Sequence, residues 1–332
     1  KYPVLKKTPK GAPSTDASVL EELSKSHELP KLILKYREYE KLRSTYIEGL
    51  KNEVVKNRVH TSYNLFGTTT GRLSSEKPNL QNIPNKTDMG QRIREFFIAD
   101  SKHVFVIADY SQIELRVLAH LSNDKSMIDM LQNRESDIHS ETASKIFQTN
   151  IESVTKDMRR KAKEVNFGLI YGMESFGLSK SLNISKKEAE ELIEAYFSQF
   201  PKIKGFLDKI VDDATTNTFT ETLYGRKRYI KELASSNFQL KAMGKRIAMN
   251  APIQGTASDI MKIAMIKLNK EIQKIKSTDL LLQIHDEIII QTPKESANKV
   301  SKIVKKEMEG ASKLKVPLFV DIKENINLSN LN

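Results

Sequence analysis

The chain has 332 residues, and its 54 Lys and Arg residues outnumber its 42 Asp and Glu residues, which gives a formal net charge of +12 and a pI of about 9.4. This excess favours polyanionic partners, because basic side chains that bind phosphates release counterions. The absence of cysteine excludes disulfides, thiolate zinc sites and cysteine nucleophiles. The polar N-terminus and the short apolar runs indicate neither a signal peptide nor a membrane span, so we expect a soluble protein with more than one subdomain.

The first fifty residues have a basic, helical pattern. The Pro-Ser-Thr-Asp sequence at 13–16 is typical of a helix N-terminus, and a second helix is predicted over 31–50. At the other end of the chain, the Asn-rich residues after Ile326 are predicted to fray. No Gly-rich Walker loop is present, so triphosphate hydrolysis for motor work has no support.

An acidic residue, Asp109, follows the apolar run 104–108, which predicts a buried strand. Apolar residues at helical spacing over 113–121 predict a helix directly after it, with Glu114 on its first turns. A carboxylate at the edge of an apolar core is poorly solvated and persists mainly beside a cation, for which we expect Mg²⁺. The alternative is a polar turn in which the acid faces water.

The segment 158–172 combines cationic and aromatic residues at a spacing of four, which places them on one face of a helix. These residues are Arg159, Lys163, Phe167 and Tyr171. A face that is cationic at its start and aromatic at its end suits a nucleoside triphosphate. The alternative is an amphipathic surface helix with snorkelling basic stems, but Gly168 and Gly172 count against it because glycine weakens a helix.

A second acidic cluster, Asp286 and Glu287, lies between the apolar runs 280–284 and 288–290. Two strand-length runs separated by a few polar residues predict a hairpin with His285 and Asp286 at its tip. Further upstream in the chain, the segment 226–246 carries seven cations and one acid. This basic segment is a candidate phosphate-tracking surface or, alternatively, an ordinary solvated face.

These segments resemble the motifs of family A DNA polymerases, the bacterial DNA polymerase I group. Residues 109–116 are similar to the first palm motif of the family, 159–172 to the O-helix of its fingers, and 285–287 to its second palm motif. Residues 70–75, 78–84 and 250–257 match further motifs, and the resemblance runs from about Thr8 to the C-terminus. Because so many long motifs occur in the family's order, coincidence does not explain the match.

The resemblance implies an α+β, right-hand polymerase fold with an antiparallel palm sheet, helical fingers and a partial helical thumb. We expect the partial thumb at 1–60, the first part of the palm at 61–122, the fingers at 123–245 and the second part of the palm at 246–332. The family's exonuclease domain precedes the thumb, so we expect no proofreading nuclease in this chain.

The implied reaction is extension of a primer 3′-hydroxyl by a dNTP through two-metal phosphoryl transfer, with release of pyrophosphate. Two Mg²⁺ ions, typically about 3.5–4 Å apart in such sites, would be held by Asp109 and Asp286. The backbone carbonyl of Tyr110 would complete a shell, since Mg²⁺ accepts carbonyls and waters beside few carboxylates. Glu287 is a nearby further candidate, and Lys163 is a candidate catalytic acid for the leaving group.

The resemblance also implies a dNTP site. Arg159 would contact the γ-phosphate, His139 the β-phosphate and Lys163 the α-phosphate. The remaining members of the set are Phe167 on the deoxyribose, Tyr171 beside the templating base, and Gln112 and Glu114. Glu114, hydrogen-bonded to Tyr171, would block a ribose 2′-hydroxyl, and phenylalanine at 167 implies discrimination against dideoxynucleotides.

The expected contacts with primer-template DNA come from Arg72, Asn250, Gln254 and His285 in the minor groove and from Arg246 on the primer side. Minor-groove acceptors lie at similar positions in every correct base pair, so such donors check geometry without choosing sequence. We expect a monomer in the bacterial cytoplasm (nucleoid) or in the DNA-containing compartment of an organelle or virus-infected cell.

Two other functions stay open at this point. A single-subunit RNA polymerase shares the carboxylates and the O-helix cations, although Glu114 and the Phe167–Tyr171 pair count against it. A non-catalytic DNA-binding remnant is the second alternative, against which stands the fact that every expected catalytic position is filled. Reverse transcription as a side activity is also open.

Overall fold

The structure, a computed structural model, describes residues 2–85 and 87–329. Helices alternate with small sheets, which confirms the α+β class. The chain forms two compact units: unit 1 comprises Lys1–Asn64, Ser75–Phe97 and Ser329–Asn332, and unit 2 comprises Leu65–Ser74 and Ile98–Leu328. No described helix is long and apolar enough to cross a membrane.

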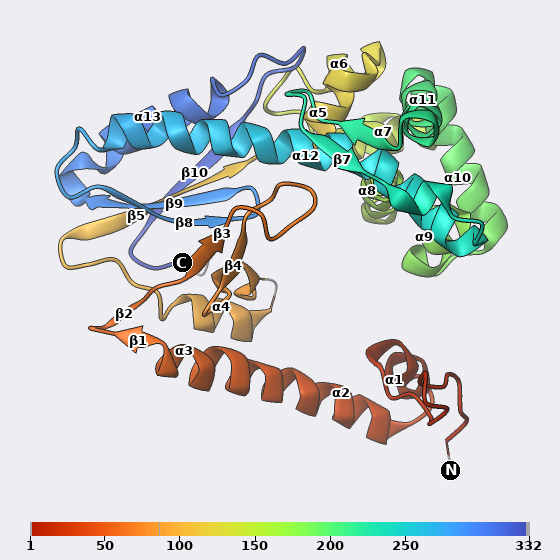
Figure 1. Cartoon of the computed structure of the whole chain (residues 1–332), viewed down its shortest axis with the longest axis horizontal. Coiled ribbons are helices and arrows are strands. Elements are labelled where there is room, and N and C mark those ends of the chain that lie inside the picture. The colour runs from red at the N-terminus through yellow and green to blue at the C-terminus, as the bar shows by residue number, and fades with distance from the viewer. Residues whose placement is uncertain (1, 86, 330–332) are drawn as a thin grey trace. The chain divides into compact units, whose positions relative to one another are not determined.

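Unit 1 begins with helices. Asp16 caps α1 (Ala17–Ser24) by accepting a hydrogen bond from the Val19 N–H (3.0 Å), as the sequence predicted. The next helical stretch comprises α2 (Glu28–Lys41), the π-helical η1 (Leu42–Glu48) and α3 (Gly49–Asn52), which follow one another without a break (Figure 1). The predicted helix over 31–50 is therefore confirmed, with bounds slightly wider than expected.

The rest of unit 1 contains short elements. These are β1 (Val54–Val55), β2 (Arg58–Val59), β3 (Ser62–Asn64), β4 (Ser74–Glu76), the 3-10 helix η2 (Leu80–Asn82) and α4 (Asp88–Arg94). β1 pairs with β2, and β3 pairs with β4. The hydroxyl of Tyr46 in η1 donates to the backbone carbonyl of Asn82, which ties the helical stretch to η2.

The central feature of unit 2 is a four-stranded antiparallel sheet. It contains β5 (His103–Tyr110), β8 (Asp279–Ile284), β9 (Glu287–Pro293) and β10 (Val320–Asn325), in the order β10-β5-β9-β8. The apolar residues 288–290 and 105–108 of the central strands are buried, as apolar strand runs predict. α13 (Ala297–Glu309), which follows the short η5 (Lys294–Ser296), contacts β5, β9 and β10, and it lies along the sheet beside α12 (Figure 1).

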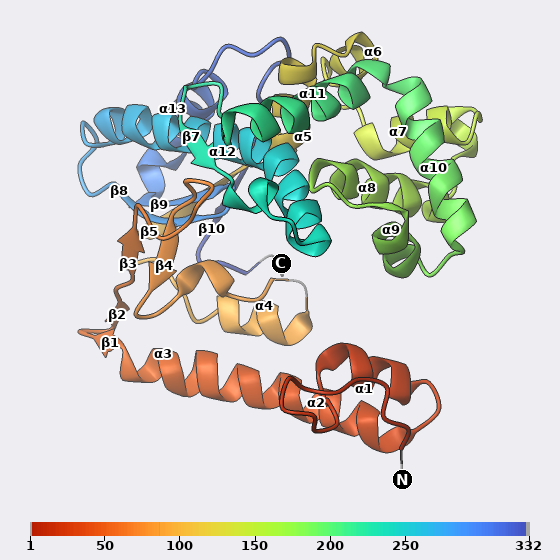
Figure 2. The same ribbon diagram turned by 45° about the vertical axis from the view of Figure 1, so that its right-hand side comes forward.

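A helical group precedes the hairpin of β8 and β9. It contains α5 (Ile113–Ser122), α6 (Lys125–Met130), α7 (Ile138–Ile146), η3 (Ile151–Ser153), α8 (Lys156–Ile170), α9 (Ser175–Leu182), α10 (Lys186–Gln199) and α11 (Pro201–Asn217). Figure 2 shows α7 to α11 gathered together, and α7 packs on both α8 and α10. Buried Val165, Leu169 and Tyr196 belong to the same apolar core as the sheet residues Val106 and Ile288.

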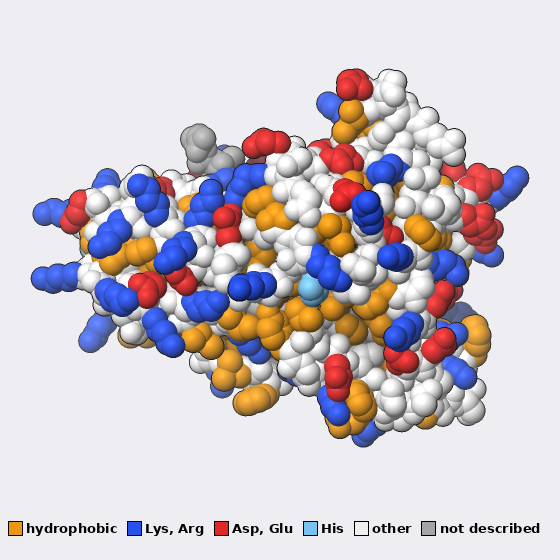
Figure 3. Space-filling view, turned by 90° about the horizontal axis from the view of Figure 1, so that it is seen from above, with side chains coloured by type: hydrophobic (Ala, Val, Ile, Leu, Met, Phe, Trp, Pro, Cys, Tyr) orange, Lys and Arg blue, Asp and Glu red, His pale blue; other side chains and the backbone are white. Residues whose placement is uncertain are grey.

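One long helix links this group to the sheet. After β6 (Phe219–Glu221), β7 (Lys227–Tyr229) and η4 (Lys231–Ala234), α12 runs from Phe238 to Ile272 and contacts α5, α8, α11 and α13. Pro252 lies inside α12, where it cannot donate a backbone hydrogen bond. Lys and Arg side chains are spread among fewer acidic ones over the face shown in Figure 3, in agreement with the positive net charge.

The expectation of a frayed C-terminal tail is wrong for the last described residues of unit 2. Asn327 forms a β-bridge with Ile98, and the Ala99 N–H donates to the Ile326 carbonyl (2.9 Å). Leu328 is only 1% exposed. Backbone pairing and apolar burial outweigh the polar composition that suggested disorder, and 330–332 lie outside the described residues.

Candidate active site

Three carboxylates meet at one edge of the sheet of unit 2. Asp109 near the end of β5 lies opposite Glu287, the first residue of β9, and Asp286 occupies the preceding turn. The Tyr110 N–H donates to the Asp286 carbonyl (3.1 Å), which fixes the turn against β5. The hairpin and its acidic tip, predicted from the two apolar runs, are therefore confirmed.

Burial acts on both Asp109 and Asp286 in this carboxylate group, and repulsion from neighbouring acids also acts on Asp109. Desolvation, together with the negative charges of Glu287, Asp286 and Asp321, raises the pKa of Asp109 to about 7, although its side chain stays open to solvent on one side. Burial also raises the pKa of Asp286, against the opposing charges of Arg72 and His285. A carboxylate with a raised pKa holds a proton more readily, and a bound cation would stabilise its ionised form in place of that proton.

The oxygen-only donors at this edge suit a hard divalent cation such as Mg²⁺. Within 2–85 and 87–329, no group of three His, Cys, Asp or Glu side chains is placed to hold a metal ion by itself. This arrangement fits Mg²⁺, which usually takes one or two carboxylates and completes its shell with waters and substrate phosphates. The hydroxyl of Tyr110 donates to the Met308 carbonyl (2.7 Å), which anchors the residue whose own carbonyl is a candidate ligand.

Glu114 is the centre of a buried polar network beside the carboxylates. It lies on the first turn of α5 and is 5% exposed. Arg72 donates to Glu114 Oε1 (2.7 Å), and the Tyr171 hydroxyl donates to Oε2 (2.9 Å). Burial raises the pKa of Glu114, whereas Arg72 and hydrogen bonds from Tyr171 and Gln254 lower it. The network therefore contains the expected Glu114–Tyr171 hydrogen bond.

Arg72 also approaches the carboxylate edge, because its Nη2 lies 3.9 Å from Asp286 Oδ1. It thus connects the Glu114 network to the predicted metal site. Gln112, which precedes α5, adopts a left-handed conformation with φ of 54°, and this turn separates the strand bearing Asp109 from the helix bearing Glu114.

The predicted helix over 158–172 is confirmed as α8. Thr155 caps its start by accepting from the Met158 N–H (3.2 Å), and Arg159, Lys163 and Phe167 lie within it. Tyr171 is the C-cap, and Gly172 follows with φ of +65°, so the helix stops where the glycine signal predicted. Arg159 and Lys163 are both exposed to solvent.

Arg159 is held by an acid that the sequence reasoning missed. Its Nε donates to Asp137 Oδ2 (2.6 Å) and its Nη2 donates to Oδ1 (3.2 Å). Burial opposes ionisation of Asp137, but hydrogen bonds from Arg159 and Ser140 lower its pKa to about 2. Asp137 also caps α7. An Asp at the start of a helix is explained by capping alone, so nothing in the sequence indicated that it pairs with an arginine on another helix.

His139 is neutral in this setting. Burial lowers its pKa to about 4, and its ring packs 5.6 Å from that of Phe167. The side-chain amide of Asn166 on α8 donates to His139 Nδ1 (3.2 Å), which leaves the proton on Nε2. His139 can therefore serve a phosphate as a hydrogen-bond donor rather than as a cation.

The predicted DNA-contacting residues on α12 lie on consecutive turns. Arg246 approaches Gly172 so closely that a Cβ there would lie 2.9 Å from Arg246 Cγ. The side-chain nitrogen of Asn250 is buried and has no hydrogen-bond partner within the described part of the chain. His285 is exposed at the hairpin turn with φ of 55°. A buried amide donor without a partner is costly, and an acceptor on a ligand would satisfy it.

The basic segment 226–246 is not one uniform phosphate-binding surface. Arg226 donates to Asp259 and to backbone carbonyls, and Lys227 pairs with Glu221 (3.4 Å). A run of charges along the sequence does not show where each side chain points. The interpretation of this segment as a phosphate-tracking surface is therefore wrong for Arg226.

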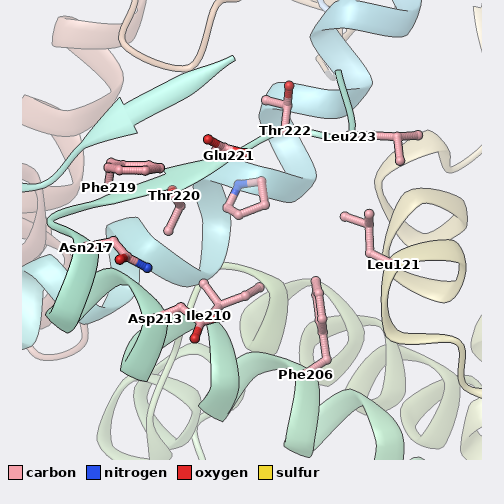
Figure 4. A pocket seen from close by; sticks show the side chains of 11 residues that line it. Leu121, Phe206, Ile210, Asp213, Asn217, Phe219, Thr220, Glu221, Thr222 and Leu223 are labelled. Carbon is pink, nitrogen blue, oxygen red and sulfur yellow. The ribbon is translucent and has the colours of Figure 1, made fainter. Parts of the chain in front are cut away.

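Two cavities of the described structure lie away from the carboxylate edge. A cavity of about 420 Å³ between α11, β6 and α12 is lined by apolar residues such as Phe206 and Pro252 and by Asp213 and Glu221 (Figure 4). Another, of about 340 Å³, reaches Gly172 and Arg246. The cavity beside Arg72 and Asp286 is only about 10 Å³.

Comparison with known proteins agrees with this geometry. The family model "DNA polymerase family A" matches residues 1–329. DNA polymerase I of Caldicellulosiruptor bescii is 51% identical over 98% of this chain, and the thermostable DNA polymerase I of Thermus aquaticus is 46% identical over 96%. The chain spans 39% of the length of each of these two relatives.

A solved structure of the POL domain of Pol1 from M. smegmatis, in complex with DNA primer-template and dNTP, is also similar. It superposes with a TM-score of 0.92 at 39% identity and covers 98% of this chain and 58% of its own. With a family model matching nearly the whole chain and relatives close to half identical, the chain belongs to DNA polymerase family A.

Proposed function

We propose that this chain is a DNA-directed DNA polymerase that extends a primer 3′-hydroxyl with dNTPs. The observation that carries the proposal is the meeting of Asp109 and Asp286 at one sheet edge, beside a network in which Arg72 and Tyr171 both bind Glu114. The POL-domain structure of M. smegmatis Pol1, which is similar over 98% of this chain, contains primer-template and dNTP and supports the same substrates here.

In this proposal Asp109, Asp286 and the Tyr110 carbonyl hold two Mg²⁺ ions, with Glu287 nearby. When bound, such ions would activate the primer 3′-hydroxyl and stabilise negative charge on the pyrophosphate that leaves. The raised pKa of Asp109 supports the site, because two neighbouring acids and burial destabilise its ionised form until a cation compensates it.

The exposed face of α8 would bind the triphosphate. Lys163 contacts the α-phosphate side and donates a proton to the leaving group, and Arg159 reaches the γ-phosphate after it releases Asp137, with which it is paired in this structure. His139 donates from Nε2 to the β-phosphate, since Asn166 occupies its Nδ1. Oriented donors of this kind stabilise charge that develops during phosphoryl transfer.

The sugar and base would lie against the aromatic end of α8. Phe167 packs on the deoxyribose, and Tyr171 fills the space beside the templating base without reading it. Glu114, with Gln112 at the start of the same helix, closes the space where a ribose 2′-hydroxyl would lie. The hydrogen bond from Tyr171 to Glu114 supports this role because it fixes the carboxylate in place.

Primer-template DNA would bind to residues of α12 and to Arg72 and His285 outside it. Asn250, Gln254, Arg72 and His285 contact the minor groove, and Arg246 contacts the primer side. The buried amide nitrogen of Asn250, which has no hydrogen-bond partner among residues 2–85 and 87–329, supports this assignment. We assign residues 1–60 to a partial thumb, 61–122 and 246–332 to the palm, and 123–245 to the fingers.

Primer extension tests the proposal. Labelled DNA primer on a DNA template should be extended with dNTPs and Mg²⁺ but poorly with rNTPs, and Asp109→Asn should abolish extension. Asp321→Asn is the matched control, because Asp321 lies opposite Asp109 on β10 but is not a proposed ligand. Extension with rNTPs in preference to dNTPs would instead indicate an RNA polymerase.

A further inference from the structure

Arg226, in the turn that leads into β7, joins two segments far apart in the sequence. Its Nη2 donates to the carbonyls of Thr70 (2.7 Å) and Gly255 (3.0 Å), and its Nε donates to Asp259 Oδ1 (2.9 Å). Gly255 and Asp259 belong to α12, whereas Thr70 belongs to the segment Leu65–Ser74. One guanidinium therefore ties this segment to the helix, with a fork of donors that an ammonium group does not have.

Two glycines make room for this guanidinium. A Cβ on Gly71 would lie 2.4 Å from Arg226 Cζ, and a Cβ on Gly255 would lie 2.9 Å from Nη2. Gly71 has φ of +81°, a conformation that suits glycine. In addition, Ser258 Oγ donates to the Gly71 carbonyl (2.7 Å). The backbone of the two residues that precede Arg72 is thus hydrogen-bonded directly to Arg226 and α12.

Asp259 keeps Arg226 in this position. The Asp259 side chain is 13% exposed, and its Oδ2 is buried without a hydrogen-bond partner in the described part of the chain. The charge of Asp259 is therefore compensated mainly by Arg226. Removing Arg226 would leave the largely buried charge of Asp259 without its ion-pair partner, which is strongly unfavourable, so the pair holds one arrangement.

We propose that Arg226 and Asp259 are positioning residues that aim Arg72 at Glu114 and at the primer terminus. The inference rests on the proposed function. Arg72 follows Gly71 directly and reaches Glu114 Oε1 at 2.7 Å. If the backbone at Thr70 and Gly71 shifts, this hydrogen bond is lost, and with it the fixed position of Glu114. Small displacements of positioning groups are enough to reduce catalysis strongly.

The test is a double-mutant cycle with Arg226→Ala, Arg72→Ala and the double variant, together with Arg226→Lys and Asp259→Asn. Single-turnover incorporation of dNTP and rNTP is measured on primer-template, with rates normalised to titrated active sites so that a misfolded fraction does not count. Lys267→Ala is the control. Lys267 lies on α12 and, like Arg226, donates to two backbone carbonyls, those of Gly310 (3.0 Å) and Ala311 (3.3 Å).

We expect Arg226→Ala to lower the efficiency of dNTP incorporation about tenfold, which is the order of magnitude of one charge-assisted hydrogen bond. Arg226→Ala should also weaken discrimination against rNTPs, as Arg72→Ala does. In the Arg72→Ala background the second change should cost less than about twofold, because both act through one interaction. Arg226→Lys should lie between wild type and Arg226→Ala, and Lys267→Ala should leave discrimination unchanged.

Additive losses in the cycle, or an unchanged rNTP ratio in Arg226→Ala, would overturn the positioning role. Should Arg226→Ala fail to fold, the same two comparisons are made with Arg226→Lys, which keeps the charge but lacks the fork. Failure of the wild-type chain to extend any primer would instead contradict the proposed function, so the two failures are distinguishable.

Discussion

Replacement of Glu114 tests how the site selects its sugar. Both carboxylate oxygens are already used, Oε1 by Arg72 (2.7 Å) and Oε2 by Tyr171 (2.9 Å), and the residue is 5% exposed. Both oxygens are held in place by these hydrogen bonds, so a ribose 2′-hydroxyl placed against Glu114 would meet the volume of a fixed side chain rather than a carboxylate free to turn toward it. Burying an unpaired hydroxyl costs about 1–3 kcal/mol, which corresponds to a roughly 5- to 150-fold loss of rNTP incorporation.

Two variants separate volume from charge. Glu114→Ala removes the wall and opens space for the hydroxyl, so we expect discrimination between dNTP and rNTP to fall by about 10- to 100-fold, within the range calculated for a buried hydroxyl. Glu114→Gln keeps the volume of the side chain and one oxygen that can accept from Arg72 or Tyr171, so discrimination between dNTP and rNTP should stay within about threefold of wild type. Both variants should incorporate dNTPs less well, because Arg72 loses a charged partner.

The assay is rapid-quench incorporation of one nucleotide, comparing kpol/Kd for dATP and rATP opposite the same template base. Tyr171→Phe serves as a companion, since it removes only the hydrogen bond to Glu114 and should weaken discrimination less than Glu114→Ala. An unchanged ratio in Glu114→Ala would show that the Glu114 side chain does not exclude the ribose. A loss in Glu114→Gln as large as that in Glu114→Ala would show that charge, and not volume, excludes the ribose.

Phe167→Tyr should raise the ratio of dideoxynucleotide to dNTP incorporation by about tenfold, because its hydroxyl can replace one hydrogen bond of the missing 3′-hydroxyl; an unchanged ratio in single-turnover assays would refute this. His139, with its pKa lowered from 6.5 to about 4, resists protonation only when folded, so its contribution to stability is present above pH 6.5 and is lost as the pH falls through 4. The lowered pKa corresponds to roughly 3 kcal/mol of folding free energy. Urea unfolding at pH 7 and pH 4.5 should therefore show that acid lowers the free energy of unfolding less in His139→Asn than in wild type. Equal losses in the two proteins would contradict this role of His139. Asp137→Asn keeps a residue that can cap α7 but removes the ion pair with Arg159. The Kd for nucleotide should therefore fall by about 1.5- to 5-fold, which corresponds to the energy of an exposed ion pair. Weaker nucleotide binding would instead mean that Asp137 helps to orient Arg159.

Local patterns in the sequence were sufficient to predict several elements of the fold. The apolar run before Asp109, the helix carrying Glu114 and the hairpin with Asp286 at its tip all form as expected, because burial periodicity determines strands and helices over short distances. The four-residue spacing in α8 likewise placed Arg159, Lys163 and Phe167 on one helix.

Contacts between distant segments could not be predicted in this way. Arg72 and Glu114 are 42 residues apart, and their pairing depends on how the segment before β4 packs on α12. The partner of Arg159 is Asp137 on α7, to which no spacing rule pointed. Arg226 was grouped with a basic surface segment, although its side chain points inward between two glycines. Sequence patterns indicate the chemical type of a side chain, whereas tertiary packing decides its direction and its partner.

The central claim is that Asp109 and Asp286 form the metal site of a DNA polymerase. Single-turnover dNTP incorporation by Asp286→Asn, with primer-template Kd measured in parallel, tests it most directly. We predict that incorporation falls by about 100- to 1,000-fold, as expected when a group that stabilises transition-state charge is removed, while DNA binding stays within about threefold of wild type. Wild-type incorporation in Asp286→Asn would contradict the account.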